Sequence, residues 1–355
     1  MSRYQRQMTL PEIGKDGQKK LHDISVLCIG AGGLGCPALL YLAAAGVGTI
    51  GIVDFDRVDE SNLQRQILYK TSQTGALKSL AAKTQIQELN PEVEVHCHPN
   101  PLDLDNIEIL FNSYDIVIDG TDNFAAKFLI NDAGVKYNTP VIYGAIQQFE
   151  GQVSVFDAEH GPCYRCLFPH PPETHIQSCA EAGVIGAIAG VVGTTQAMQA
   201  MMIAINDNSF RPLTGQLWTI DMRSMESQLL SIPKNPDCPV CSQKSEDIVL
   251  EYTAPLCAAQ QETHEISVSE LRALHDTTII DIREEYEWKT GHIPDAVLHP
   301  LSKISDGILP DVSEDEDVIL YCQQGVRSLQ AALFLQERMP NKLLSLKGGY
   351  DAYLN

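Results

Sequence analysis

The feature that most constrains the fold is a regular alternation of short β-branched runs with helix-like stretches over the first part of the chain. Alternation at this spacing is typical of parallel sheets with helices on both faces. The sequence therefore predicts an α/β protein that begins with a doubly wound, Rossmann-like sheet. The expected strands are 25–30, 49–55, 92–97, 114–120 and 140–145, extended by 151–157, 216–222 and 227–233. The expected helices between them are 34–46, 75–89 and 123–137.

A break in the pattern of alternating strands and helices indicates a second domain. After about residue 242 the sequence shows no sustained period, and strand-like runs resume at 277–283 and 317–322. The 355 residues are enough for two domains of ordinary size. We therefore expect a first domain at 1–242, a linker at 243–262 and a smaller α/β domain at 263–355.

Charge excludes several classes of partner. The chain has 46 Asp and Glu residues against 25 Lys and Arg residues, for a net charge of −21. Nucleic acids and anionic membranes repel this charge, so neither is an expected partner. The N-terminus lacks the apolar core of a signal peptide, which predicts a cytoplasmic protein. The uncharged run 184–205 is long enough to cross a bilayer, but its Thr and Gln residues and acidic flanks favour a buried helix.

A glycine-rich turn follows the first expected strand. Gly30, Gly32 and Gly35 form a G-x-G-x-x-G pattern that opens a helix, where backbone N–H groups bind phosphate. Asp54 ends the second strand, where a carboxylate accepts hydrogen bonds from ribose hydroxyl groups. Taken alone, these residues predict a dinucleotide site, and an NAD-dependent oxidoreductase is the first hypothesis.

The residues after the second strand favour a nucleoside triphosphate instead. This stretch supplies Asn62, Arg65 and Gln66. The next helical stretch supplies Lys78, and Asp122 follows the fourth strand. Two cations and a carboxylate at the carboxyl ends of neighbouring strands suit a triphosphate with its metal ion. The sequence therefore predicts ATP and Mg²⁺ at this edge of the sheet.

The first domain closely resembles the MoeB/ThiF adenylyltransferases, bacterial relatives of ubiquitin-activating enzymes, in the motifs GAGGLG, VDFDRVDESNLQRQ, GALKSLAAK and TDNF and in YQRQ near the N-terminus. The resemblance covers about residues 2–242. It implies that ATP adenylates the C-terminal glycine of a small ubiquitin-fold sulfur carrier ending in Gly-Gly, with release of pyrophosphate. It also implies a homodimer in which Arg6 reaches the partner's site as an arginine finger.

The same resemblance implies a role for each matching residue. Gly33 lies against the nucleotide and Asp54 binds the ribose. Phosphates are held by Asn62, Arg65 and Lys78, and Asp122 binds Mg²⁺. The complete set expected at ATP and Mg²⁺ is Gly30, Gly32, Gly33, Asp54, Ser61, Asn62, Leu63, Gln64, Arg65, Lys78, Asp122 and Asn123.

Four of the ten cysteines form two CxxC pairs that are far apart in the sequence, Cys163 with Cys166 and Cys238 with Cys241. Each pair can place two thiolates on one side of a turn, and two pairs complete a tetrahedral shell for Zn²⁺. Four thiolates leave no position for water, so a structural role is expected. A redox-active CxxC is the alternative. The MoeB/ThiF family carries the same two pairs.

A second reactive group is expected near the C-terminus. Cys322 follows an apolar strand and begins a loop that ends at Arg327 and leads into a helical pattern. N–H groups in such a loop point inward with a helix dipole behind them, which favours a nucleophilic thiolate. DIREEYEWKTGHIPDA, CQQGVR and LKGGYDAY together resemble a rhodanese domain.

The rhodanese resemblance implies that Cys322 carries sulfane sulfur as a persulfide, with Arg327 in the catalytic loop. The sulfur comes from a cysteine desulfurase or thiosulfate, and Gln323, where many rhodaneses have Arg, leaves the donor open. Asp281 and Arg283 are expected to support the fold and the loop. A phosphatase is the minority hypothesis, because related phosphatases use a longer loop.

The two domains together predict one reaction sequence. The carrier carboxylate becomes an acyl-adenylate, the persulfide of Cys322 attacks it, and reductive release leaves a thiocarboxylate. Cys179 lies where the MoeB/ThiF family often has a cysteine in a mobile crossover segment; it either takes part in acyl or disulfide chemistry or has no chemical duty. The carrier's pathway stays open among molybdopterin, thiamine and tRNA thiolation. A noncatalytic zinc-stabilised scaffold is the alternative class.

Overall fold

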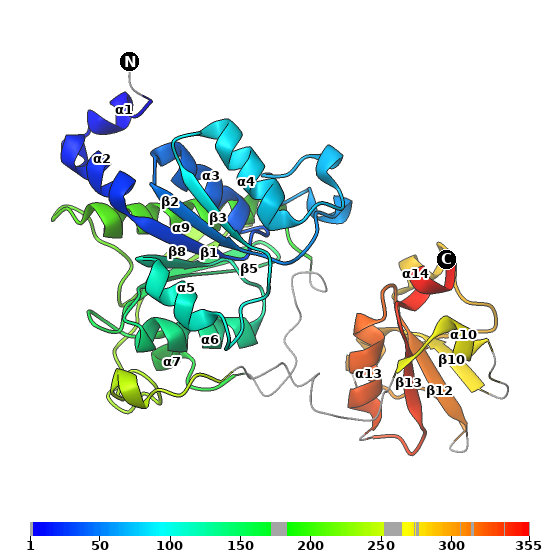
Figure 1. Cartoon of the computed structure of the whole chain (residues 1–355). Helices are drawn as coiled ribbons and strands as arrows, with labels where there is room; N and C mark the ends of the chain where they lie inside the picture. The colour runs from blue at the N-terminus through cyan, green and yellow to red at the C-terminus, as the bar shows by residue number, and fades with distance from the viewer. Residues whose placement is uncertain are drawn as a thin grey trace. The chain divides into compact units, whose positions relative to one another are not determined.

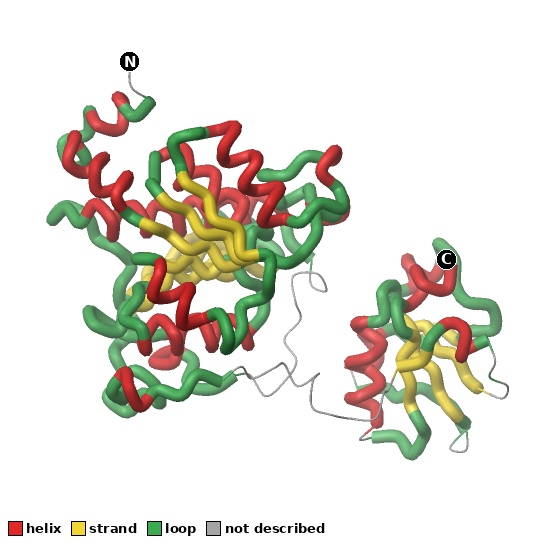
Figure 2. The backbone as a smooth tube through the Cα atoms, viewed as in Figure 1, coloured by secondary structure: helices red, strands yellow, loops and turns green. Residues whose placement is uncertain are grey.

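Two compact units make up the chain, residues 1–253 and 254–355 (Figures 1 and 2). The computed structural model describes residues 3–171, 183–251 and 265–354, apart from 273, 275, 276, 306, 314, 315 and 337. Each unit is built around one β-sheet that is covered by helices.

An eight-stranded sheet forms the first unit, in the order β3-β2-β1-β4-β5-β6-β7-β8. The first five strands in this order are parallel, and the last three continue the sheet in antiparallel fashion. The predicted doubly wound sheet and its extension are therefore confirmed. The strands are β1 (Ser25–Ile29), β2 (Thr49–Val53), β3 (Glu94–His98), β4 (Ile116–Asp119), β5 (Val141–Gln147), β6 (Glu150–Phe156), β7 (Gln216–Asp221) and β8 (Glu226–Ser231).

Apolar residues on both faces of the parallel strands explain why helices cover both sides. In β1, Val26 and Cys28 point into one core, and Leu27 and Ile29 point into the other. In Figure 1, α3 and α4 lie on one side of the sheet, and α5 and α6 lie on the other. The helices of this unit are α1 (Gln5–Met8), α2 (Gly14–Asp23), α3 (Gly35–Ala45), α4 (Lys78–Leu89), α5 (Ile107–Ser113), α6 (Phe124–Lys136), α7 (Tyr164–Leu167) and α9 (Gly186–Ile205), with short 3-10 turns η1 (Glu60–Asn62), η2 (Thr71–Gln73) and η3 (Ser245–Asp247).

The long apolar run forms α9, which packs against α3, β5 and β6. Within the described residues it is the one helix long and apolar enough to cross a membrane, and half of its most apolar window is buried in the protein. Gln196 is fully buried and donates from Nε2 to the carbonyl groups of Asp119 (2.8 Å) and Ile142 (3.1 Å). The prediction of a buried helix that packs in the core is confirmed.

The second unit is a smaller α/β domain, as predicted. Its parallel sheet has the order β11-β10-β12-β13-β9. The strands are β9 (Glu265–Ile266), β10 (Thr277–Asp281), β11 (Val297–Leu298), β12 (Asp317–Tyr321) and β13 (Leu343–Leu346). The helices are α10 (Val268–Leu271), α11 (Glu285–Trp288), α12 (Leu301–Ser305), α13 (Val326–Gln336) and α14 (Gly349–Leu354).

The segment expected to be a linker, 243–262, begins with residues that belong to the first unit. Ile248 is 3% exposed, and Lys136 of α6 donates to its carbonyl oxygen. The side chain of Leu250 packs against the core under α5 and α6. Apolar side chains that find a core explain why this stretch is fixed although its sequence shows no period.

Candidate functional site

In the glycine-rich turn, two backbone segments lie in direct contact. At Gly35 a Cβ atom would lie 2.0 Å from the carbonyl oxygen of Gly30, so only glycine lets α3 begin this close to β1. The Asp54 carboxylate holds the turn, because Oδ2 accepts from the backbone N–H of Ala31 at 2.8 Å and Oδ1 accepts from that of Asp56 at 2.9 Å. Burial raises the pKa of Asp54, although these two N–H groups act in the opposite direction.

The loop after β2 folds back over this turn. Asp59 accepts from the backbone N–H of Ser61 at 2.8 Å and so begins η1. Arg65 donates to Oδ1 of Asn62 at 2.7 Å, and its aliphatic stem lies 3.6 Å from where a Cβ atom of Gly33 would be. These contacts place the guanidinium group beside the glycine-rich turn.

Neighbouring residues of the same loop anchor it on both sides. Leu63 packs against the core that contains α3, and the backbone of Gln64 lies against Gly186 at the start of α9. Gln66 is 4% exposed, and its amide nitrogen lies 3.7 Å from where a Cβ atom of Gly32 would be. Its Oε1 has no hydrogen-bond partner among the residues that the structure describes. Buried polar atoms are usually paired, so Oε1 of Gln66 is an exception beside the glycine-rich turn.

Lys78 is the first residue of α4 and its side chain is only 7% exposed. Its Nζ lies 2.9 Å from Oδ2 of Asp56, a carboxylate that is 55% exposed. The positive charge of Lys78 also lowers the pKa of Asp54, which places both groups in one electrostatic environment. The cation predicted from sequence is therefore buried next to the glycine-rich turn.

The third component is the β4–α6 loop, which touches the glycine-rich turn where Gly30 meets Gly120. Asp122 and Asn123 are exposed in this loop, and Asn123 caps α6 by accepting from the backbone N–H of Ala126 at 2.8 Å. The exposed carboxylate of Asp122 stands next to that cap, an arrangement compatible with a hydrated Mg²⁺ ion.

The predicted nucleotide residues thus gather where β1, β2 and β4 end, the usual ligand edge of such sheets. Arg6 is the exception. It lies on α1 and lines a groove with Ala44, Met198 and Ile205, near the C-terminal ends of α3 and α9, whereas the glycine-rich turn lies at their N-terminal ends. Within one chain, Arg6 and the glycine-rich turn are at opposite ends of these helices.

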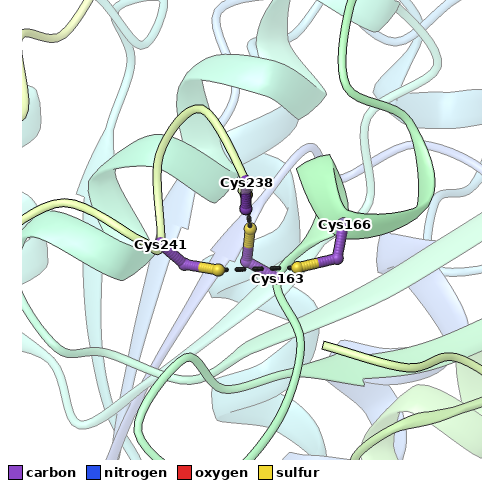
Figure 3. A group of neighbouring side chains, drawn as sticks. All are labelled: Cys163, Cys166, Cys238 and Cys241. Carbon is purple, nitrogen blue, oxygen red and sulfur yellow. Dashed lines mark hydrogen bonds between the residues drawn. The ribbon is translucent and has the colours of Figure 1, made fainter. Parts of the chain in front are cut away.

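The two CxxC pairs meet in space (Figure 3). All four sulfur atoms lie within 4.8 Å of one another, with Sγ–Sγ distances of 3.5 Å between Cys163 and Cys238 and between Cys166 and Cys241. A tetrahedral zinc–thiolate shell requires sulfur separations of about 3.8 Å, given Zn–S bonds of about 2.3 Å. Burial and then the neighbouring thiols raise the pKa of Cys163, so a cation is needed to hold four thiolates this close. The residues fit a structural metal ion.

The first CxxC pair is fixed to α6 by buried polar contacts that sequence reasoning missed. Arg165, between the two cysteines, makes a two-pronged ion pair with Asp132, with N–O distances of 2.8 and 2.7 Å. The backbone N–H of Tyr164 donates to Oδ1 of Asn131 at 2.7 Å. The polar pair Asn131-Asp132, which follows the apolar run Phe128–Ile130 in this helix, is the signal in the sequence.

In the second unit Cys322 directly follows β12, as predicted, but its side chain is buried, with 1% exposed. Its Sγ accepts from the backbone N–H of Gly325 at 3.2 Å and from Oγ of Ser328 at 3.6 Å. At Gly349, with φ of +60°, a Cβ atom would lie 2.3 Å from the Cys322 carbonyl oxygen. The C-terminal Gly-Gly turn therefore packs directly against the cysteine loop.

The charged residues around this loop are paired. Arg327 makes a two-pronged ion pair with Glu287, at 3.0 and 2.7 Å, and these hydrogen bonds raise the pKa of Arg327. Asp281 and Arg283 form an ion pair that is fully buried. Arg283 also donates to Oε1 of Gln323 at 2.8 Å, so the pair supports the loop as expected. Sequence reasoning missed Glu287.

Cys179 lies outside the described residues, so its role stays a prediction. Of the remaining cysteines assigned to packing, Cys28 and Cys36 are fully buried in the core. Cys97 is partly buried against the same core and donates to the Ser79 carbonyl group.

Comparison with known proteins places these features in context. The ThiF family profile matches residues 4–240, and the rhodanese-like domain profile matches residues 267–355. The probable adenylyltransferase/sulfurtransferase MoeZ of Mycobacterium tuberculosis is 40% identical, over 99% of this chain and 92% of MoeZ. The sulfur carrier protein adenylyltransferase of Thermus thermophilus is 46% identical, over 72% of this chain and 96% of that protein. The crystal structure of E. coli MccB with ATP shares the fold, with a TM-score of 0.60 and 21% identity over 68% of this chain and 75% of MccB.

Proposed function

Because the chain belongs to the ThiF family and ends in a rhodanese-like domain, we propose that it activates a small sulfur-carrier protein with ATP and then loads sulfur onto it. The chain is an adenylyltransferase and sulfurtransferase, like its full-length relatives. The observation that carries the proposal is the pairing of two sites in one chain, a glycine-rich turn flanked by Arg65 and Lys78 and a cysteine loop that ends at Arg327.

In the first step, the C-terminal glycine carboxylate of the carrier attacks the α-phosphate of ATP. It forms an acyl-adenylate and releases pyrophosphate. The attacking carboxylate is ionised at neutral pH, so no general base is needed. The protein's task is to align the attack and neutralise phosphate charge. We assign phosphate binding to Asn62, Arg65 and Lys78 and ribose binding to Asp54.

The rest of the nucleotide set shapes the pocket. We propose that the glycines of the turn let the backbone approach the nucleotide closely. We propose that Ser61, Leu63, Gln64 and Asn123 make further contacts with the nucleotide. Asp122 would hold Mg²⁺, which supplies charge neutralisation at the phosphates when bound. An NAD-dependent oxidoreductase would use the turn and Asp54 but would leave Lys78 and Arg65 without a task.

In the second step, Cys322 as a persulfide attacks the acyl carbonyl. AMP leaves, and an acyl disulfide links the carrier to Cys322. A first thiol then attacks the acyl-bound sulfur, and Cys322 leaves as a thiolate. A second thiol attacks the sulfur of the first, so a disulfide forms between the two thiols and the carrier leaves as the thiocarboxylate. We propose Cys179 as a residue of this chain that either supplies one of these thiols or carries the acyl group as a covalent intermediate. We assign the first step to residues 1–242 and the second to 263–355, with 243–262 between them.

We propose that the sulfur donor is a persulfide, such as one on a cysteine desulfurase, rather than thiosulfate. Thiosulfate is a dianion and needs cations at the loop. Arg327 is already bound by Glu287, and position 323 is a glutamine whose amide is held by Arg283 and Asp351. A persulfide carries at most one negative charge and makes a smaller electrostatic demand on this loop.

Zn²⁺ is the proposed occupant of the four-cysteine site, because a closed thiolate shell suits this ion. The proposed assembly is a cytoplasmic homodimer in which Arg6 completes the partner's nucleotide site. The carrier belongs to molybdopterin synthesis or to a related pathway such as thiamine synthesis or tRNA thiolation.

The decisive experiment is intact-mass analysis of Gly-Gly-ended carriers incubated with the protein, ATP, Mg²⁺, a reductant and either a persulfide or thiosulfate. We expect one carrier to exchange a terminal oxygen for sulfur, with the persulfide as the better donor. Cys322→Ala should still release pyrophosphate but load no sulfur. Sulfur loading by Cys322→Ala would overturn the sulfur-transfer step, and absence of pyrophosphate release with every carrier would overturn the activation step.

A further inference from the structure

Two buried hydroxyl groups lie behind the sulfur atom of Cys322. Ser328 is the third residue of α13, Ser345 lies on β13, and both are 0% exposed. Their Oγ atoms are 2.8 Å apart, and Oγ of Ser328 is 3.6 Å from Sγ of Cys322. The three groups form a continuous chain from the back of the sheet to the reactive sulfur.

The carbonyl group of Gly325 competes for the same protons. It accepts the helical hydrogen bond from the backbone N–H of Leu329 at 3.1 Å, and it lies 3.1 Å from Oγ of Ser328 and 3.3 Å from Oγ of Ser345. A carbonyl oxygen has two lone pairs, so after the helical bond it takes one hydroxyl proton. The hydroxyl protons of Ser328 and Ser345 therefore compete for one lone pair of the Gly325 carbonyl oxygen.

Two arrangements satisfy the short contact between the hydroxyl groups. In one, Ser345 donates to Ser328, and the proton of Ser328 is available to Sγ of Cys322 or to the Gly325 carbonyl; a negative charge on Sγ favours the sulfur. In the other, Ser328 donates to Ser345, Ser345 donates to the Gly325 carbonyl, and the sulfur receives no hydroxyl proton. The arrangements differ only by rotation of two O–H bonds, so no heavy atom has to move.

We propose that Ser345 is a positioning residue for sulfur transfer, which donates to Ser328 and so directs the Ser328 hydroxyl proton at Cys322 whenever that sulfur carries negative charge. The proposal rests on the proposed persulfide function of Cys322. A hydroxyl donor stabilises a thiolate more than a neutral sulfur, because hydrogen bonds to charged groups are stronger.

The charge on Sγ changes twice in the reaction. When the thiolate attacks a persulfide R–S–SH, a bond forms between Sγ and the outer sulfur, and the donor's S–S bond breaks. R–S⁻ leaves with the electron pair and takes the proton of the outer sulfur, so the negative charge moves to the new terminal sulfur. When a thiol later cleaves the acyl disulfide, the charge returns to Sγ. The hydroxyl pair can follow both changes by rotation.

Removal of Ser345 shifts this balance against the sulfur. The Ser328 oxygen then accepts no hydrogen bond from Ser345, which makes its own hydroxyl a weaker donor to Sγ at 3.6 Å. The Gly325 carbonyl at 3.1 Å remains the nearer acceptor. The Ser328 hydroxyl therefore stabilises charge on the sulfur less, although Ser328 itself is unchanged.

The test measures the alkylation rate of Cys322 by iodoacetamide at one neutral pH, by mass spectrometry of the peptide that contains Cys322, in the full chain. We expect Ser345→Ala to slow alkylation roughly tenfold, since it removes a charge-assisted hydrogen bond. Ser328→Ala should slow it at least as much, and Ser328→Ala/Ser345→Ala no more than Ser328→Ala. Ser345→Thr retains the hydroxyl group and should restore the rate.

A wild-type rate in Ser345→Ala, or additive effects in the double variant, would overturn the proposal. Thermal unfolding of the second unit identifies any variant that fails to fold. If Ser345→Thr fails to fold, the comparison of the single variants with the double variant tests the proposal instead. Alkylation needs neither ATP nor a carrier. A protein that loads no sulfur can therefore still show these rate differences, and the two proposals fail independently.

Discussion

Lys78 shows how a single residue can be both buried and available to an anion. Its side chain is 7% exposed, yet its ion-pair partner Asp56 is 55% exposed and can turn into solvent. Burial lowers the local dielectric constant, so the positive charge acts more strongly on a nearby phosphate than it would on the surface. The exposed partner contacts the ammonium group without enclosing it.

We expect Lys78→Ala to lower ATP–pyrophosphate exchange roughly 100-fold, the scale found when one stabilising group is removed from an active site. Lys83→Ala is the matched control, because Lys83 lies on the same helix and carries the same charge. Exchange by Lys83→Ala should stay near the wild-type rate. Equal effects of both substitutions would mean that net charge, and not the position of Lys78, controls the reaction.

The sequence identified the groups that belong to compact motifs and missed the groups that depend on pairing across the fold. Lys78, Arg65 and Cys322 stand in recognisable local patterns. Glu287 and Ser345 do not, because the contact of each with the cysteine loop exists only once β10, β12 and β13 are aligned. A single sequence carries no information on such register.

At the scale of elements, α6 connects the nucleotide edge to the cysteine cluster. Its first turn is capped by Asn123, beside Asp122. Lys127, one turn further, donates to the buried carboxylate of Asp119 at 2.9 Å. The following turns bind the first CxxC pair through Asn131 and Asp132. One rigid helix therefore positions both features.

We expect Arg165→Ala to destabilise the first unit by about 3 kcal/mol, because it leaves the buried Asp132 carboxylate unpaired. We also expect it to release zinc faster to a chromogenic chelator. Arg223→Ala is the matched control, since Arg223 forms a surface ion pair with Asp221. Its thermal unfolding and zinc release should match those of the wild type. If Arg165→Ala released the metal at the wild-type rate, the ion pair would not contribute to metal binding.

Helices and strands were predicted best where the spacing of apolar residues in the sequence matches the residues that are buried in the core. The five parallel strands of the first unit follow β-branched runs, so their existence was evident from sequence. The ends of the elements were predicted less well. The helix expected from residue 75 is α4, which begins at Lys78, because residues 71–77 form η2 and a turn that belongs to the loop after β2. Tertiary contacts decide such boundaries.

At the scale of the whole molecule, the groove beside Arg6 indicates why one chain is not a complete enzyme in our proposal. The groove has a volume of about 480 Å³ and is lined mostly by apolar residues, of which Leu10 is 51% and Met198 43% exposed. A second copy of the chain would cover these side chains and bring an Arg6 from outside. In our proposal Arg6 serves the nucleotide site of the partner, because the site of its own chain lies at the other end of α3.

Mixing two inactive variants tests this arrangement. In a mixed dimer of Arg6→Ala and Lys78→Ala, one of the two sites keeps both residues if Arg6 acts across the dimer. Random exchange of subunits should then restore about a quarter of wild-type adenylation. The control mixture of Lys78→Ala and Asp122→Ala should restore none, because both residues serve the site of their own chain. No recovery in the first mixture would place Arg6 within its own chain's site or outside catalysis.

The separation of the two CxxC pairs has a consequence for how the protein is made. A ribosome adds residues one after another, at about 5–20 per second, so Cys163 and Cys166 emerge several seconds before Cys238 and Cys241. β7 and β8 are synthesised within that interval. The four-cysteine cluster can form only when the antiparallel half of the sheet is available. Its closure therefore marks the completion of the first unit, before the cysteine loop of the second unit has been synthesised.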